Sequence, residues 1–325
     1  CLKMNNDLLC PGDVKQLSDL VQDSLASKSS LLVKGTGSKD GWGHPDGNGQ
    51  KVQISGISGI TLYEPEELVM TAAAGTTIGH IKKTLDIADQ QLAFEPPDIA
   101  RIYGAPKGTG TLGGVLACNL AGPRRIQAGA ARDHFLGFEA VSGRGEIFKS
   151  GGRVVKNVTG FDLSKLLAGS YGTLAIMTSI TIKVLPKPEK TRSILVYGLS
   201  HQDAIAAMTN TLHSPHEVNA AAHLPDNLSG KSAVDYVNSP GKSVTVVRVQ
   251  GPAPSVEARC VALRNLVSRF GDVEELHAHN SNILWSEIAD VADLIDNPKK
   301  ILWRLSVPPA TGANIANAIK EFSDA

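Results

Sequence analysis

Residues 151–184 read GGRVVKNVTGFDLSKLLAGSYGTLAIMTSITIKV, and this stretch decides the fold. Glycines, small hydroxyl side chains and an Asn157/Asp162 pair lie between apolar runs. From Ile176 to Val184 apolar and polar residues alternate, which predicts a strand. Glycines at this density let a backbone approach a large ligand and turn its N–H groups toward it. The stretch therefore predicts a strand that is entered through a ligand-binding loop.

Length and charge limit what the chain can be. Its 325 residues are enough for two domains with proper cores. The 32 basic and 32 acidic residues balance, which argues against a nucleic-acid groove or a patch for anionic membranes. No apolar run reaches the roughly 20 residues that span a bilayer, and the first residues lack a signal-peptide core. We therefore expect a cytoplasmic protein; the family resemblance described below adds that any membrane contact would be peripheral, at the inner membrane and through partner subunits.

Metal-binding patterns are weak in this sequence. The cysteines, Cys1, Cys10, Cys118 and Cys260, are widely spaced with no C-x-x-C pair, which excludes an intrinsic iron–sulfur or zinc-ribbon site and suits a reducing cytosol. His277 and His279 would share one face of a strand and could form a metal pair. No third ligand accompanies them, so we expect solvent-facing histidines and no metal.

A proline-containing linker divides the chain. Residues 183–188 read KVLPKP, and the two prolines cannot continue a sheet. We expect one domain over residues 1–188 and a second over residues 189–325. In the second, the order of strands and helices is β-α-β-β-α-β, which is typical of a ferredoxin-like layer. A short helix around Trp285 and a strand over Ile301–Val307 are expected to follow.

Two segments match the letters of nucleotide-binding motifs, but the residues around them do not suit those motifs. Residues 108–113 match G-x-G-x-x-G, and Asp133 lies at a suitable distance for a ribose partner. That fingerprint needs a buried strand directly before it, whereas Pro106 and Lys107 stand there. A Walker interpretation of residues 35–39 fails because the second Gly-Lys-Ser/Thr element is missing.

Three glycine loops together are more informative than any one of them. They read GTGSK (35–39), GTLGG (110–114) and GSYGT (169–173). A single loop of this kind is most simply a tight turn. Three of them suit a long ligand with a pyrophosphate in its middle, because each can present backbone N–H groups to an anion.

The loops and four further motifs resemble a known family. The motifs are EPP (95–97), ACNLAGPRR (117–125), VKNVTGFDL (155–163) and LWRLS (302–306). The loop order resembles the PCMH-type FAD-binding domain of the vanillyl-alcohol-oxidase superfamily. The motifs are similar, more narrowly, to the FAD-binding E subunit of bacterial glycolate oxidase, over a span from about Pro11 to Val307.

This resemblance implies the fold and the cofactor. It implies an α+β fold, in which a PCMH-type FAD-binding domain of two α/β subdomains is followed by a ferredoxin-like cap on the substrate side. The family's C-terminal segment is not found before Ala325, so we expect a C-terminally truncated cap domain. Some members carry a histidine joined to FAD in the first loop. Ser38 and Lys39 stand there instead, and His44 lies several residues on, so we expect noncovalent FAD.

The resemblance also implies which residues bind FAD. The first two loops would hold the pyrophosphate, the third loop would line the adenine and ribose end, and the segment just before the third loop would lie on the flavin side. In that order the residues are Gly35, Thr36, Gly37, Ser38, Gly110, Thr111, Gly113 and Gly114; Gly169, Ser170, Gly172, Thr173 and Ile176; and Asn157, Thr159, Gly160 and Asp162.

The implied activity is the FAD-dependent oxidation of glycolate, a small 2-hydroxy acid, to glyoxylate. Electrons would pass through flavin to partner subunits, a D-type flavoprotein and an iron–sulfur F-type subunit. Such chemistry needs a cation for the substrate carboxylate and a base for the hydroxyl proton. Arg124, Arg125 and Lys156 are the candidate cations, although pairing with Asp133, Asp162 or FAD phosphate would explain them equally well. No base stands out.

Two other functions stay open. The chain could be a non-catalytic FAD-binding, structural or electron-relay subunit of the same complex, with the chemistry done by the D-type subunit. A standalone aldonolactone- or lactate-type oxidase of the same fold is the weaker alternative, because the AGPRR motif at residues 121–125 points to the glycolate oxidase family.

Overall fold

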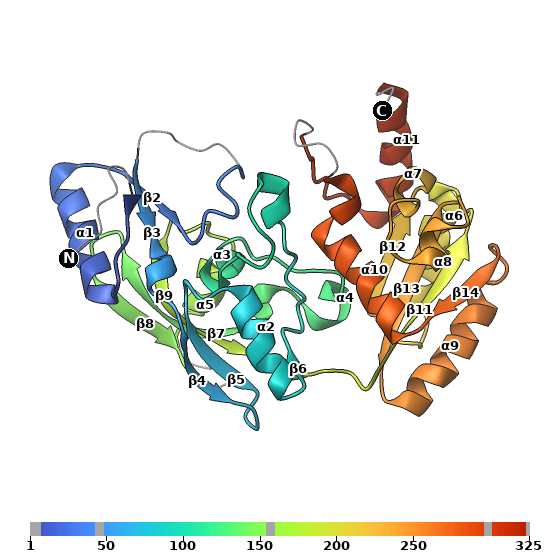
Figure 1. Cartoon of the computed structure of the whole chain (residues 1–325), viewed down its shortest axis with the longest axis horizontal. Coiled ribbons are helices and arrows are strands. Elements are labelled where there is room, and N and C mark those ends of the chain that lie inside the picture. Colours follow the sequence, from blue (N-terminus) through green and yellow to red (C-terminus); the bar gives the residue numbers. More distant parts are fainter. Residues whose placement is uncertain (1–7, 43–48, 154–159, 296–300, 323–325) are drawn as a thin grey trace. The chain divides into compact units, whose positions relative to one another are not determined.

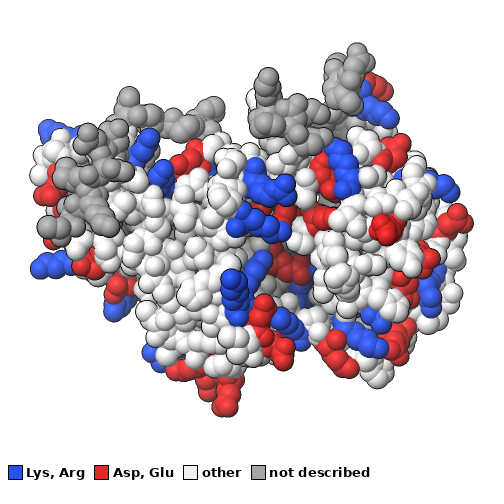
Figure 2. All heavy atoms as spheres, in the orientation of Figure 1, with Lys and Arg blue, Asp and Glu red and all other residues white. Residues whose placement is uncertain are grey.

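The computed structural model describes residues 8–42, 49–153, 160–295 and 301–322. It divides into two compact units, whose elements are labelled in Figure 1. The first holds the described residues up to Gly122 and Gly129–Lys187, and the second holds Pro123–Ala128 and the described residues from Pro188 onward. No helix in these ranges is long and apolar enough to cross a membrane. On the face drawn in Figure 2, basic and acidic side chains are interspersed.

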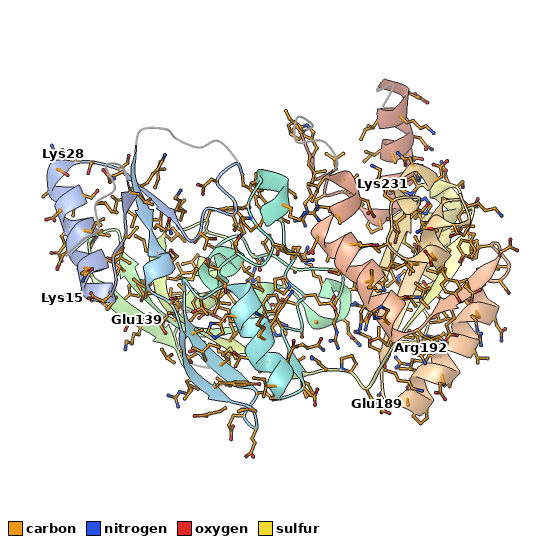
Figure 3. All side chains as sticks on the ribbon, in the orientation of Figure 1. Lys15, Lys28, Glu139, Glu189, Arg192 and Lys231 are labelled. Carbon is orange, nitrogen blue, oxygen red and sulfur yellow. The ribbon has the colours of Figure 1, made fainter. Side chains whose placement is uncertain are left out.

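The main sheet of the first unit is built around β9 (Ala175–Lys183). Its strands lie in the order β4-β5-β9-β7-β8, and every neighbouring pair is antiparallel. The other four are β4 (Ile60–Glu64), β5 (Val69–Ala73), β7 (Phe135–Ser142) and β8 (Ile147–Gly151). Threonines inside β9 are tolerated because they are paired: the Thr178 hydroxyl donates to the Glu139 carbonyl at 3.1 Å, and Glu139 is labelled in Figure 3.

A smaller parallel sheet precedes the main one. Its order is β1-β3-β2, formed by β1 (Leu8–Leu9), β2 (Leu31–Lys34) and β3 (Gln50–Gln53). Helix α1 (Val14–Ser27) connects β1 to β2 and begins at an N-cap, where the Asp13 carboxylate accepts from the Gln16 N–H at 2.8 Å. A two-stranded antiparallel ribbon of β6 (Gln90–Gln91) and β10 (Leu185–Pro186) completes the strands of this unit.

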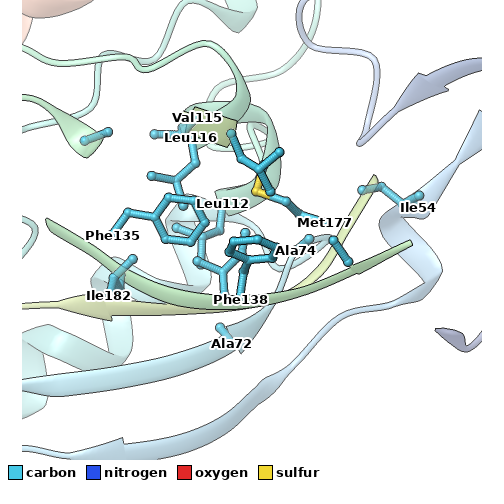
Figure 4. Packing of buried hydrophobic residues seen from close by; sticks show 14 of the residues in the cluster. Ile54, Ala72, Ala74, Leu112, Val115, Leu116, Phe135, Phe138, Met177 and Ile182 are labelled. Carbon is cyan, nitrogen blue, oxygen red and sulfur yellow. The ribbon is translucent and has the colours of Figure 1, made fainter. Parts of the chain in front are cut away.

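Helix α3 (Leu112–Ala117) is anchored on one face of the main sheet. Figure 4 shows Leu112 and Leu116 packed against Phe135 and Phe138. Leu112 and Leu116 are fully buried, and such burial stabilises by about 1.5–3 kcal/mol for each side chain. The loop that leads into α3 is therefore held in a fixed position. The other helices of the unit are α2 (Ile78–Ile87) and α5 (Leu163–Leu167), with 3₁₀ turns at Ile54–Gly56, Ala100–Tyr103 and Ala131–His134.

The second unit has the predicted ferredoxin-like arrangement. Its antiparallel sheet has the order β12-β13-β11-β14, made of β11 (Lys190–Tyr197), β12 (Ala220–Leu224), β13 (Val244–Gly251) and β14 (Val273–Leu276). Apolar residues of α6 (His201–Leu212) and α9 (Ala253–Val267) share one core cluster with the sheet. Those of α10 (Ala278–Asp290) form a second cluster with it.

Polar contacts fix the ends of these elements. The Glu189 carboxylate accepts from the Ala253 N–H at 3.1 Å, at the start of α9, and Arg192 of β11 pairs with Glu275 of β14 at 3.3 Å; Glu189 and Arg192 are labelled in Figure 3. The shorter helices of this unit are α4 (Arg125–Ala128), α7 (Asp226–Ser229), α8 (Asp235–Asn238) and α11 (Gly312–Phe322), with 3₁₀ turns at Ala292–Leu294 and Pro309–Thr311.

Two local predictions in this unit are wrong. Ile301–Val307 forms no strand, and Trp303 is 79% exposed, because an alternating pattern makes a strand only where a partner edge is available. The helix around Trp285 is longer than expected, and it begins at the two histidines that were assigned to a strand. His277 stands at the N-cap of α10 and His279 in its first turn, so they do not share a strand face, although both are exposed as predicted.

Candidate functional site

The first glycine loop follows directly from the carboxyl end of β2. Gly37 has φ +82°, a conformation that glycine adopts without strain, and the Asp40 N–H donates to its carbonyl at 3.1 Å. Lys34 pairs with Asp40 across the loop at 2.8 Å. The loop is thus a turn that is closed by its own hydrogen bond and ion pair.

The second glycine loop, residues 108–114, is tied to the start of α2. The Ile78 N–H donates to the Gly110 carbonyl at 2.8 Å, and the Leu112 N–H donates to the Thr76 carbonyl at 2.9 Å. At the other end, the Gly108 N–H donates to the Asp98 carboxylate. Thr111 caps α3, since its hydroxyl accepts from the Gly114 N–H at 3.2 Å.

The structure brings the first and second loops together. The Thr36 hydroxyl donates to the Thr109 carbonyl at 2.7 Å. A Cβ added at Gly35 would overlap the Thr111 hydroxyl and lie 2.9 Å from its Cγ2 methyl, so only glycine fits at this crossing. We call the two segments Gly35–Lys39 and Gly108–Gly114 the paired loops.

The paired loops present a set of unused donors. Within the described part of the chain, no acceptor is recorded for the N–H groups of Thr36–Lys39 or of Thr109–Thr111. Gly113 differs, because its N–H donates to the Ala74 carbonyl at 2.8 Å. Successive N–H groups of this kind form an anion-binding concavity, and at this site they come from two loops.

The third glycine loop, residues 169–173, is built differently. The Gly169 N–H donates to the Leu116 carbonyl at 3.0 Å, and the Tyr171 N–H donates to the Ala117 carbonyl at 2.9 Å. The loop therefore closes the end of α3 with its own donors. Tyr171 also contacts Trp42 edge to face, with ring centroids 6.2 Å apart, so this loop lies beside the residues that follow the first.

A cavity of about 220 Å³ opens between α1, β2 and the start of β9. Its walls are mainly apolar side chains and glycine backbone, namely Val21, Ser24, Leu25, Ser29, Leu31, Val33, Val141, Ser142, Gly143 and residues 172–176. Ligand sites usually measure roughly 300–1,000 Å³, so this cavity suits one end of a long ligand. Val33 lines it, and Gly35 begins the paired loops about 7 Å further along the strand direction. The cavity and the paired loops are therefore adjacent along the chain, at the end of β2.

The other predicted site residues are only partly placed. Asn157, Thr159 and Lys156, like His44, lie outside the described residues. Gly160 is exposed, and Asp162 caps α5 by accepting from the Lys165 N–H at 3.2 Å.

Arg124 and Arg125 lie in the segment that packs with the second unit. Arg125 is exposed there, whereas the Nε and Nη1 atoms of Arg124 are buried. The paired loops thus bring together residues predicted for the pyrophosphate, and Gly172, Thr173 and Ile176 of the predicted adenine end line the cavity. Of the predicted catalytic cations, Arg124 and Arg125 belong to the second unit, and Lys156 lies outside the described residues.

Sequence reasoning assigned no binding role to Lys39. Its amino group lies 3.4 Å from the Ser38 hydroxyl, between the paired loops. Burial lowers the pKa of Lys39, and Cys118 and Asp98 oppose part of that shift. Burial likewise raises the pKa of the Cys118 thiol, against the effect of Lys39. The only sequence signal was the position of Lys39 as the last residue of a glycine loop.

Comparisons with known proteins agree with this geometry. Residues 7–151 match the family described as FAD binding domain. Glycolate oxidase subunit GlcE of Escherichia coli is 38% identical over 212 residues, which cover 65% of this chain and 58% of that protein. Glycolate oxidase subunit GlcD of Bacillus subtilis is 24% identical over 335 residues, which cover 98% of this chain and 68% of that protein. The match to GlcE thus spans less than two thirds of that protein's length.

Solved structures confirm the predicted fold. An alkyldihydroxyacetonephosphate synthase superposes with a TM-score of 0.68 at 16% identity, covering 89% of this chain and 56% of the synthase chain. A p-cresol methylhydroxylase with substrate bound superposes with a TM-score of 0.64 at 13% identity, covering 86% of this chain and 60% of that one. At such low identity these likenesses concern the fold alone.

Proposed function

We propose that this chain is a flavoprotein and the FAD-binding subunit of a glycolate oxidase, because residues 7–151 match the FAD binding domain family and GlcE is 38% identical over 212 residues. The reaction would be the oxidation of glycolate to glyoxylate. When bound, FAD supplies the acceptor for the hydride that leaves the substrate's carbon 2, while the hydroxyl proton leaves to a base. A D-type flavoprotein and an iron–sulfur F-type subunit would complete the assembly and carry the electrons onward.

One observation carries the proposal, namely the unused N–H groups of the paired loops next to the cavity at β2. The groups on Thr36–Lys39 and Thr109–Thr111 would hold the pyrophosphate, because they are successive donors from two neighbouring loops with no acceptor among the described residues. Gly172, Thr173 and Ile176 line the cavity and would take the adenine end. Gly160 and Asp162, with Asn157 and Thr159, would stand on the flavin side.

The first loop supports noncovalent attachment. Ser38 is buried at the position where related flavoproteins carry a histidine, and a serine hydroxyl cannot replace that imidazole. The test is an absorbance spectrum of the purified chain before and after denaturation and filtration. We expect a flavin band that passes through the filter. Flavin retained by the denatured chain would contradict noncovalent binding, and failure to bind added FAD would contradict the proposed function.

For the substrate side, Arg124, Arg125 and Lys156 are the proposed cations, since an arginine fork matches a carboxylate well. The test is glycolate-dependent dye reduction by the assembled complex carrying Arg124→Ala, Arg125→Ala or Lys156→Ala. Arg144→Ala, at an exposed turn between β7 and β8, is the matched control.

We expect loss of turnover in at least one of the three variants with flavin still bound. Unchanged turnover in all three would favour the alternative, an FAD-binding or electron-relay subunit whose partner does the chemistry. Turnover by the purified chain without partners, on a lactate- or aldonolactone-type substrate, would instead favour a standalone oxidase.

A further inference from the structure

The amino group of Lys39 lies where the paired loops meet. A Cβ added at Gly114 would stand 3.1 Å from the Lys39 Nζ, and one added at Gly110 would stand 3.9 Å away. The first loop thus folds a cation back over the second loop. The missing side chains at Gly110 and Gly114 leave the room that this amino group occupies.

This position is unfavourable for the charged amine of the protein alone. Burial lowers the pKa of Lys39, so the surroundings only partly replace the water that the ammonium loses. The nearby Asp98 carboxylate is already engaged, because it accepts from the N–H groups of Ala100 and Gly108. Within the residues described, the hydrogen-bond partner of Nζ is the neutral Ser38 hydroxyl. A bound anion would stabilise the ammonium far better than a hydroxyl does.

The surrounding donors indicate which anion fits. The N–H groups of Thr36–Lys39 and Thr109–Thr111 come from both sides of the same crossing. A carboxylate offers two oxygen atoms and one charge, which leaves most of these donors unsatisfied. A pyrophosphate diester offers four non-bridging oxygens and two charges, so it can accept from both loops and from an ammonium at once.

We propose that Lys39 binds the pyrophosphate of FAD through its ammonium group. The proposal rests on the proposed function, which supplies FAD as the ligand, and it adds the residue that selects a dinucleotide over a flavin without phosphates. Lys39 would act in binding and not in the oxidation itself, so its effect is measured as affinity.

The experiment compares the affinities of the full chain for FAD, ADP and riboflavin, measured by titration calorimetry and flavin fluorescence. Lys39→Met removes the charge, and Lys39→Gln is a polar second variant in case the first does not fold. Lys15→Met is the matched control, since Lys15 is exposed on α1 and is labelled in Figure 3. A charge-assisted hydrogen bond corresponds to a change of about 10- to 100-fold in affinity.

We expect both Lys39 variants to bind FAD and ADP about 10- to 100-fold more weakly, with riboflavin binding and the control unchanged. FAD and ADP binding equal to wild type would overturn the proposal and leave the proposed function standing. An equal loss for riboflavin would also overturn it, because Lys39 would then contact the flavin ring. A wild-type chain that binds no FAD would overturn the proposed function, and the role of Lys39 with it.

Discussion

The paired loops and the third glycine loop have nearly the same composition but opposite hydrogen-bond states. In the paired loops, two runs of successive N–H groups have no acceptor among the described residues. In the third loop, Gly169 and Tyr171 donate to the carbonyls of Leu116 and Ala117, the last residues of α3. A high density of glycines therefore indicates a turn. Whether the backbone N–H groups of that turn already have acceptors then distinguishes donors that are available to a ligand from donors that close a helix end.

The difference between the loops has a structural cause. The third loop runs beside a helix end, where orphan carbonyls need donors. The paired loops lie beside one another, and each meets the other through a side chain, Thr36 or Thr111, that leaves most backbone donors unused. We expect substitutions in the paired loops to change FAD affinity. Substitutions at Gly169–Tyr171, the part of the third loop that closes α3 and precedes the cavity-lining Gly172 and Thr173, should change stability.

Of the substitutions in this comparison, Gly35→Val should weaken FAD binding the most. Its side chain would overlap Thr111, and overpacking of this kind costs about 1–3 kcal/mol. Because the loops would be forced apart, we expect FAD binding to weaken by about 30-fold, with a smaller fall in melting temperature. Titration calorimetry and a thermal melt measure the two effects on the same sample.

A double-mutant cycle sharpens that result. Thr111→Ala removes the two atoms nearest to a Cβ at position 35, the hydroxyl and the Cγ2 methyl. In a cycle of Gly35→Ala and Thr111→Ala, the double variant should therefore bind FAD more tightly than the sum of the two single losses predicts. Strict additivity would mean that the crossing of the two loops is not what positions the donors.

Gly169→Ala should show the opposite behaviour. Gly169 has φ +84°, and an alanine held there costs about 1–2 kcal/mol. We expect lower stability in chemical denaturation, with FAD affinity within about twofold of wild type once the chain is folded. A large loss of affinity at unchanged stability would place this loop with the paired loops and break the distinction.

The smallest effect should come from Thr36→Val. The variant keeps the shape of the side chain but loses the 2.7 Å hydrogen bond to the Thr109 carbonyl, a contribution of about 0.5–1.5 kcal/mol. We expect FAD affinity to fall by about threefold to tenfold. Thr61→Val, on β4 of the main sheet, also loses a hydroxyl bond to a carbonyl, at 3.2 Å, and should leave affinity unchanged.

Much of this molecule was predictable because local patterns agreed with it. The strand from Ile176, the β-α-β-β-α-β order and the three glycine loops all follow from spacing and turn chemistry. The contact between Gly35 and Thr111 was not predictable, since it joins residues far apart in the chain. The burial of Lys39 was not predictable for the same reason, because it depends on the second loop, which is distant in the sequence. Ile301–Val307 shows the opposite error, because its alternation is real but finds no partner strand in the described structure.

The path of the chain between the units limits how the protein can be divided. Pro123–Ala128 leaves the first unit, packs with the second and returns, and the chain crosses again between Lys187 and Pro188. A single proteolytic cut in the proline linker would therefore not release two self-contained fragments. A gene segment ending at residue 188 would carry α4 without β12, the strand it packs against. The first unit is therefore not an independent module that can be expressed or transferred without the second unit.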